Sequence, residues 1–221
     1  MASVTSDKLP IAILISGRGS NMRAIAERAA SGELPVEIRA VISDKPEAAG
    51  LATAASMNIP TRILLPRDFA DRSSYDAALA SLVASFEPRL VVLAGFMRIL
   101  NPNFIAAFAD CILNIHPSLL PLYRGLHTHR RALEAGDRLH GASVHFVTEE
   151  LDGGPVVIQA RVTVQPGDTE SSLSARVQQQ EYRIYSQAID WFARGRLSLR
   201  EHRAWLDGRP LDAPLIETAS D

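Results

Sequence analysis

The sequence has little cysteine, no long apolar run and almost no net charge. Its single cysteine, Cys111, excludes an intrachain disulfide and a metal site built from several cysteines, and it suits a reducing cytosol. The longest apolar stretch, residues 90–97, is far too short to cross a membrane, and the run at 11–15 is too short for a signal peptide. The formal charge of −2 provides no general attraction to nucleic acid or to an anionic membrane. We therefore expect a cytoplasmic protein without nucleic acid or membrane partners, in which a phosphate-bearing ligand could still bind a local site.

The first half of the chain alternates between strand and helix patterns. Apolar, β-rich segments that predict strands lie at 11–15, 36–43, 61–65 and 90–95. Segments that predict helices follow them from about Met22 to a stop at Gly32, and at 47–57, 73–86 and 102–109. This alternation predicts a parallel sheet with right-handed crossovers. The strand at 90–95 is the most apolar, so we expect it near the centre of the sheet.

The pattern changes after a fifth strand at 111–116. A long loop, which we expect to be the mobile element of the chain, leads into a short helix, and two strands then follow with no helix between them. The expected ranges are 117–128 for the loop, 128–135 for the helix, 141–147 and 155–163 for the antiparallel strands, 169–194 for a long helix and Asp207–Pro210 for a hairpin. The predicted fold class is α/β, a Rossmann-like doubly wound and mostly parallel sheet with an antiparallel C-terminal portion. We expect residues 1–221 to form one domain.

The first candidate site is the loop Ser16–Asn21, which reads SGRGSN. Its glycines let the backbone approach an anion, and the following helix offers unpaired N–H groups at its N-terminus. The dinucleotide fingerprint requires a third glycine where this chain has Met22, and no Gly-Lys pair follows as in a P-loop. The loop therefore favours a single phosphate group. A tight turn without a ligand, or a dinucleotide-binding module, are the alternatives.

The second candidate site combines Asn114, His116 and Asp152. Side chains alternate along a strand, so Asn114 and His116 project to the same side at its carboxyl end, and Pro117 restricts the backbone of His116. An amide and an imidazole together can polarise a carbonyl and move a proton. Asp152 begins a Gly-Gly-Pro turn, where an aspartate often binds its own backbone. Near His116, it would instead orient the imidazole.

The remaining histidines favour structural interpretations. His127 and His129 could form a metal site with His116, but with no carboxylate nearby they are more typical of surface or capping residues. His140 lies among polar residues, and His145 lies within a strand, where a satisfied histidine is expected. We predict no metal.

Five segments together resemble a known family. They are SGRGSN (16–21), AGFMRIL (94–100), NIHPSLLP (114–121), the run from Gly141 to Val156, and ARVQQQE (175–181). In this order they resemble the phosphoribosylglycinamide formyltransferases, from about residue 10 to Pro210. The resemblance implies transfer of a formyl group from 10-formyltetrahydrofolate, a cosubstrate, to the amine of 5′-phosphoribosylglycinamide. The products would be formylglycinamide ribonucleotide and tetrahydrofolate, in de novo purine (IMP) biosynthesis.

The resemblance also implies roles for individual residues. The catalytic residues would be Asn114, His116 and Asp152. The ribonucleotide and its phosphate would be bound by Gly19, Ser20, Asn21, Gln178 and Glu181. The folate would be bound by Arg72, Met97, Arg98, Ile99, Leu100, Asn114 and Val147. The N-terminal half (10–110) would then hold the ribonucleotide, and the C-terminal half (111–210) would hold the catalytic and folate-binding parts.

Arg124 departs from the pattern, because Pro-Gly is common before Leu-His-Thr where this chain has Arg124-Gly125. Because of this departure, the resemblance does not predict the local conformation of the loop, although it still predicts the reaction class. A 10-formyltetrahydrofolate hydrolase, or a formyltransferase acting on tRNA or a sugar nucleotide, uses related chemistry. The SGRGSN loop favours a phosphorylated acceptor over water, and both a monomer and a homodimer fit the sequence.

Overall fold

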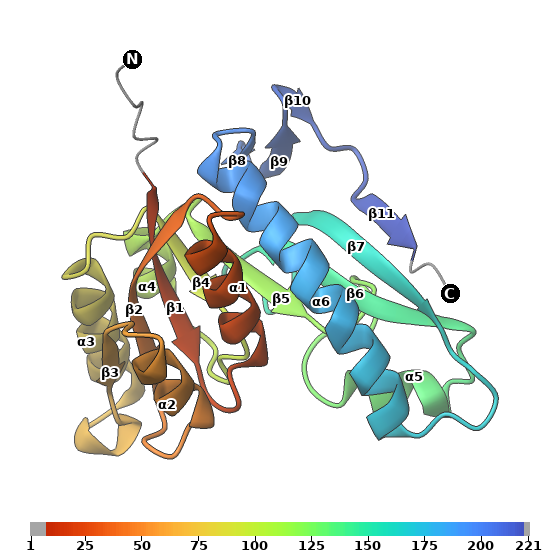
Figure 1. Ribbon diagram of the computed structural model, residues 1–221, viewed down its shortest axis with the longest axis horizontal. Helices are drawn as coiled ribbons and strands as arrows, with labels where there is room; N and C mark the ends of the chain where they lie inside the picture. The colour runs from red at the N-terminus through yellow and green to blue at the C-terminus, as the bar shows by residue number, and fades with distance from the viewer. Residues whose placement is uncertain (1–7, 219–221) are drawn as a thin grey trace.

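Most strands of the protein belong to one twisted, mixed sheet (Figure 1). The computed structural model describes residues 8–218. The strands of this sheet are β1 (Leu9–Ile15), β2 (Val36–Ser43), β3 (Thr61–Ile63), β4 (Leu90–Leu93), β5 (Ile112–His116), β6 (Leu139–Phe146), β7 (Val156–Thr163) and β11 (Leu215–Thr218). Their order is β11-β7-β6-β5-β4-β1-β2-β3. Only β6 runs antiparallel to its neighbours, β5 and β7.

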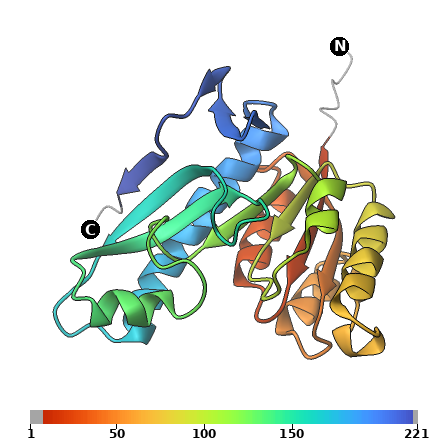
Figure 2. The same ribbon diagram turned by 180° about the vertical axis from the view of Figure 1, so that it is seen from behind.

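Helices cover both faces of the sheet, as in a doubly wound fold (Figures 1 and 2). The helices are α1 (Ser20–Ser31), α2 (Ala49–Ser56), the 3-10 turn η1 (Pro66–Asp68), α3 (Arg72–Ala84), α4 (Pro102–Ala107), α5 (Thr128–Glu134) and α6 (Glu170–Ala193). Along β1, Ile11 and Ile13 join the core under α1 and α6, while Ala12 and Leu14 join the core under α3 and α4. Burial on both faces explains why this strand is an unbroken aliphatic run.

The predicted fold class is confirmed. β4 lies in the interior of the sheet between β1 and β5, and the two C-terminal strands pair antiparallel as expected. The third strand is shorter than predicted, because the chain turns into η1 at Pro66. The third helix begins earlier, at Arg72, where Asp71 and Ser74 form a capping box.

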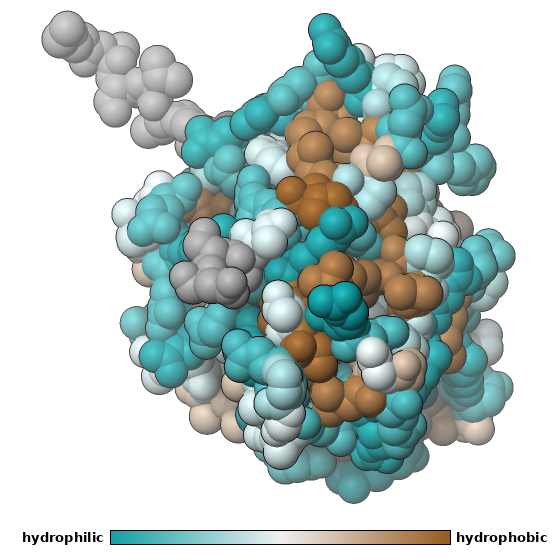
Figure 3. Space-filling model, turned by 90° about the vertical axis from the view of Figure 1, so that its right-hand side faces the viewer, coloured by the Kyte–Doolittle hydropathy of each residue, from teal (hydrophilic) through white to brown (hydrophobic). Residues whose placement is uncertain are grey.

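The C-terminal region contains strands that the sequence did not predict. The expected hairpin at 207–210 is present and joins β9 (Arg203–Leu206) to β10 (Arg209–Pro210), and β8 (Leu197–Arg200) completes a small second sheet. β11 pairs parallel with β7 at the edge of the main sheet. Hydrophobic residues form a band on the face seen in Figure 3, and the strand β11, which contains the exposed Leu215 and Ile216, lies on this side of the molecule (Figure 1).

The order of the strands creates a crevice beside β1. The chain leaves β1 towards β2 on one side, whereas β4 lies on the other, so the loops after β1 and β4 diverge at their carboxyl ends. The loops still touch at their start, where Ser16 N donates to Gly95 O at 3.0 Å. β5 adds a third loop at the same edge. No helix within residues 8–218 is both long and apolar enough to cross a membrane.

Candidate active site

The loop after β1 presents a helix N-terminus with free donors. Gly19 is the N-cap of α1 in a left-handed conformation (φ 69°), and no side chain caps the helix. The first turn contains no acidic residue, so its N–H groups remain available to an anion. A Cβ atom at position 19 would lie 2.8 Å from Gly50 Cα, so both the conformation and the packing require glycine.

The residues predicted to bind the ribonucleotide lie together around this loop. They line one pocket of about 290 Å³. Gln178 Nε2 donates to Ser20 Oγ at 3.0 Å, and Asn21 Nδ2 donates to Glu181 Oε2 at 2.7 Å, so α6 is joined to the start of α1. Burial raises the pKa of the Glu181 carboxyl, and the hydrogen bond from Asn21 opposes that rise.

The three predicted catalytic side chains also lie together. Asn114 and His116 stand at the carboxyl end of β5, and Asp152 comes from the turn that follows β6. His116 Nδ1 lies 3.5 Å from Asp152 Oδ2, which also accepts a hydrogen bond from Gly125 N at 2.9 Å. Asp152 has a left-handed backbone (φ 47°), which turns its carboxylate back towards the strand end.

His116 contacts an acceptor on each side of its ring. Its Nε2 lies 3.0 Å from Tyr123 O, and a carbonyl oxygen can only accept, so Nε2 carries the hydrogen. Its Nδ1 faces the Asp152 carboxylate. The loop after β5 therefore lies over the imidazole in this structure.

A second pocket, of about 90 Å³, lies on the other side of Asn114. Its lining includes most of the predicted folate-binding residues, namely Arg98, Ile99, Leu100, Asn114 and Val147, together with Asp152. Two predicted residues lie elsewhere. Met97 lines the pocket around the phosphate loop. The side chain of Arg72 donates from Nη2 to Ile99 O at 2.5 Å, so it supports the segment without lining the pocket.

The chemistry of this second pocket fits the pterin end of a folate. Phe96, Leu100 and Val147 provide apolar walls, and the Nε of Arg98 is buried without a partner. Ligand pockets usually measure roughly 300 Å³ or more. The pocket is smaller than that in this structure, and the exposed Ile99 and Leu151 lie on its walls.

A serine that is not among the predicted site residues joins the two pockets. The buried Ser16 donates from Oγ to Asp44 Oδ1 at 2.6 Å and accepts from Met97 N at 2.8 Å. Ser16 begins the phosphate loop, and Met97 begins the segment next to the folate-side pocket. The hydroxyl therefore fixes one loop against the other.

Two histidines differ from expectation. His140 has polar neighbours, as expected, but it is buried, because its strand lies in the sheet interior, and its Nε2 lies 3.1 Å from His129 Nδ1. His129 is half-buried and lines the phosphate-side pocket instead of the outer surface. His145 is satisfied, as expected, but it stands directly beside Asn114, with 3.0 Å between its Nε2 and Asn114 Nδ2. No local pattern indicates that contact, which depends on how β5 and β6 pair.

Arg124 connects two loops. Its guanidinium pairs with Glu150, which belongs to the turn that carries Asp152, and its backbone oxygen accepts from Arg131 Nη1 at 2.7 Å. The unusual residue thus takes part in the contact between the loop after β5 and the loop after β6.

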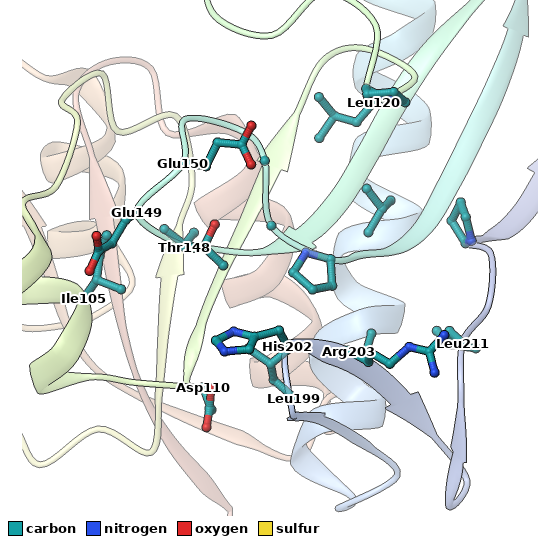
Figure 4. A pocket seen from close by; sticks show the side chains of 18 of the residues that line it. Ile105, Asp110, Leu120, Thr148, Glu149, Glu150, Leu199, His202, Arg203 and Leu211 are labelled. Carbon is teal, nitrogen blue, oxygen red and sulfur yellow. The ribbon is translucent and has the colours of Figure 1, made fainter.

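A further pocket of about 860 Å³ lies outside the cluster (Figure 4). Thr148, Glu149 and Glu150 form part of its wall, with His202 and Arg203 from the β8–β9 region. The segment 147–150 lines both this pocket and the folate-side pocket, and so separates them. Within residues 8–218, no group of three or more His, Cys, Asp or Glu side chains is arranged to hold a metal ion.

Comparison with known proteins gives consistent matches over nearly the whole chain. Residues 9–189 match the formyl transferase family. A phosphoribosylglycinamide formyltransferase from Escherichia coli K12 is 53% identical over 201 residues, which cover 91% of this chain and 95% of that protein. The solved structure of a phosphoribosylglycinamide formyltransferase from Coxiella burnetii has a TM-score of 0.89 at 45% identity, covering 94% and 99% of the two chains. A glycinamide ribonucleotide transformylase 1 from Symbiobacterium toebii has a TM-score of 0.90 at 40% identity, covering 93% and 97%.

Proposed function

Because the chain belongs to the formyl transferase family, whose members use 10-formyltetrahydrofolate as formyl donor, we propose that it formylates the amine of 5′-phosphoribosylglycinamide. The products are formylglycinamide ribonucleotide and tetrahydrofolate, and the reaction belongs to purine biosynthesis. The formyl donor is a cosubstrate and no metal takes part.

One observation carries this proposal. The cluster of Asn114, His116 and Asp152 lies between two pockets of different character. The pocket of the phosphate loop offers helix N–H groups and polar side chains, which suit a phosphorylated sugar. The other pocket offers apolar walls and buried polar atoms, which suit a pterin. A formyl group carried by the second ligand would then meet an amine carried by the first at the cluster.

The side chains of the cluster have complementary roles in this reaction. Asn114 N–H and His116 Nε2–H, which must first leave its contact with Tyr123 O, stabilise negative charge on the formyl oxygen while the amine forms its bond to the formyl carbon. Asp152 orients the imidazole of His116. As the bond from the formyl carbon to the folate nitrogen breaks, His116 relays the proton that the attacking amine loses to the departing nitrogen.

The two halves of the chain divide this work within one domain. Residues 10–110 supply the phosphate loop, and residues 111–210 supply the catalytic cluster and most of the folate-side wall, with residues 96–100 reaching across from the first half. Gln178 and Glu181 reach back to the phosphate loop from the second half. We place the enzyme in the cytoplasm as a monomer or homodimer.

A two-arm assay tests the function. The protein is incubated with 10-formyltetrahydrofolate, with and without 5′-phosphoribosylglycinamide, and both tetrahydrofolate and the formylated ribonucleotide are measured. We expect both products to appear together and only when the acceptor is present. Deformylation without acceptor would identify a hydrolase, and absence of any turnover together with a thermal shift induced by NAD would favour a dinucleotide-binding module.

A further inference from the structure

The strongest unassigned feature next to the cluster is His145, on β6. Asn114 and His145 are direct cross-strand partners in the antiparallel pair of β5 and β6. Asn114 Nδ2 lies 3.0 Å from His145 Nε2. This pairing of β5 with β6 is regular, whereas the register of β6 with its other neighbour, β7, shifts between Val144 and His145.

The hydrogen bonds of His145 define which ring nitrogen carries hydrogen. His145 Nδ1 lies 2.9 Å from Phe146 O, and a carbonyl can only accept, so Nδ1 is the donor. In the neutral ring Nε2 then has a lone pair and no hydrogen. Nε2 can therefore accept a hydrogen bond from the amide nitrogen of Asn114. If the amide were turned round, a lone pair of its oxygen would face the lone pair of Nε2, which is unfavourable.

The surroundings of His145 keep the ring neutral. The side chain is 2% exposed, and burial lowers the pKa of His145 to about 4, although the Phe146 carbonyl and Asp152 act in the opposite direction. Asp152 Oδ1 lies 3.8 Å from His145 Nε2, beyond hydrogen-bond distance. The ring is therefore an acceptor for Asn114 near neutral pH.

We propose that His145 is a positioning residue that holds the Asn114 amide through its unprotonated Nε2, so that the second amide N–H is left for the formyl oxygen. The inference rests on the proposed function, because it takes Asn114 as a donor to that oxygen. One of the two Asn114 N–H groups is used by His145, and an amide fixed in this way needs little reorganisation when charge develops.

The test is a double-mutant cycle with two substitutions at position 145. His145→Leu fills the space but removes the acceptor, whereas His145→Gln keeps a side-chain oxygen that can accept from Asn114. We expect His145→Leu to lower kcat about 10- to 100-fold, the range expected for a misplaced catalytic group. We expect the KM for the ribonucleotide to stay near the wild-type value, because its pocket lies on the far side of β5. His145→Gln should recover most of the rate.

The second half of the cycle is made in the Asn114→Ala background. If His145 acts through Asn114, adding His145→Leu should change the rate by less than about twofold, because the interaction is already absent. A full, additive loss would overturn the positioning role. If Asn114→Ala alone keeps wild-type turnover, both the proposed role of Asn114 and this inference are wrong. The overall function is tested separately, by the assay with and without acceptor.

A direct readout uses the folded wild-type enzyme. Nitrogen-15 NMR of labelled histidine distinguishes a ring nitrogen that carries hydrogen from one that does not. We expect His145 to show a protonated Nδ1 and an unprotonated Nε2 from pH 6 to pH 8. A protonated Nε2 in this range would contradict the proposal even if a His145 variant failed to fold.

Discussion

The two sides of the catalytic cluster are built in different ways. The proposed phosphate side rests on the turn between β1 and α1, where uncapped backbone N–H groups follow a left-handed glycine. The cluster itself is built from side chains of β5, β6 and the turn after β6, which are brought together by antiparallel pairing. All six histidines of the chain follow residue 115, so the turn itself contains no imidazole, although His129 of α5 lines its pocket.

In the proposed function, this difference separates substrate binding from catalysis. A backbone site depends on one local turn and tolerates changes in distant side chains. A side-chain cluster depends on register, buried hydrogen bonds and the protonation of its members. Substitutions in the turn between β1 and α1 should therefore change the KM for the ribonucleotide, while substitutions in the side-chain cluster should change kcat.

The largest expected effect comes from the cluster. Asn114→Ala and His116→Ala should each lower kcat about 100- to 1,000-fold, the usual loss when one donor to a developing oxyanion is removed. The affinity for the ribonucleotide, measured by calorimetry with 5′-phosphoribosylglycinamide alone, should change little. Near-wild-type kcat in His116→Ala would show that the imidazole is not part of the chemistry.

A smaller effect is expected on the phosphate side. Gly19→Ala forces a left-handed alanine, which costs roughly 1–2 kcal/mol, and its Cβ would press on Gly50, so the KM for the ribonucleotide should rise about tenfold or more. The rate at saturation should be kept. Gly32→Ala is the matched control, because Gly32 is also left-handed, lies at the other end of α1 and has open space around it. It should lower the melting temperature and leave KM unchanged.

A moderate effect is expected from acid, which should lower the stability of β6 more than that of β1. Burial lowers the pKa of both His140 and His145 from 6.5 to about 4. Between pH 4 and pH 6.5 the unfolded chain binds protons at these two histidines that the folded chain does not bind. Their contribution to the free energy of unfolding is therefore complete above pH 6.5 and falls as the pH drops towards 4.

Hydrogen exchange at pH 7 and pH 5 measures this effect. Between pH 7 and pH 5, protection corrected for intrinsic exchange should fall more in β6 than in β1. An equal loss in both strands would mean that the histidines do not set the acid sensitivity.

The smallest effect is expected where the two sides meet. Ser16→Ala removes the hydroxyl between Asp44 and Met97 N and leaves a buried carboxylate oxygen without that donor. Both substrates should show KM values raised roughly two- to fivefold, consistent with a loss of about 1 kcal/mol for a hydrogen bond. A change in only one KM would show that the hydroxyl does not couple the loops, and Ser31→Ala, exposed at the end of α1, serves as the control.

Much of the fold was predictable because it follows from local patterns. The aliphatic run at 11–15 is buried on both faces of the sheet, and the alternation of strands and helices requires parallel pairing up to β5. The phosphate loop is also local, since glycine 19 and the helix that follows it are neighbours in the chain. The short strand β11 was not predictable, because its pairing with β7 depends on a distant strand.

The sequence by itself determined the parallel half of the sheet, the loop with its free helix N–H groups, and the residue types that formyl transfer requires. Only the tertiary structure decided that His145 stands opposite Asn114, that His140 is buried against His129, and that Ser16 joins Met97. The physical reason is that helix caps and turns involve residues a few positions apart. Cross-strand contacts depend on register, which the whole packed sheet sets together.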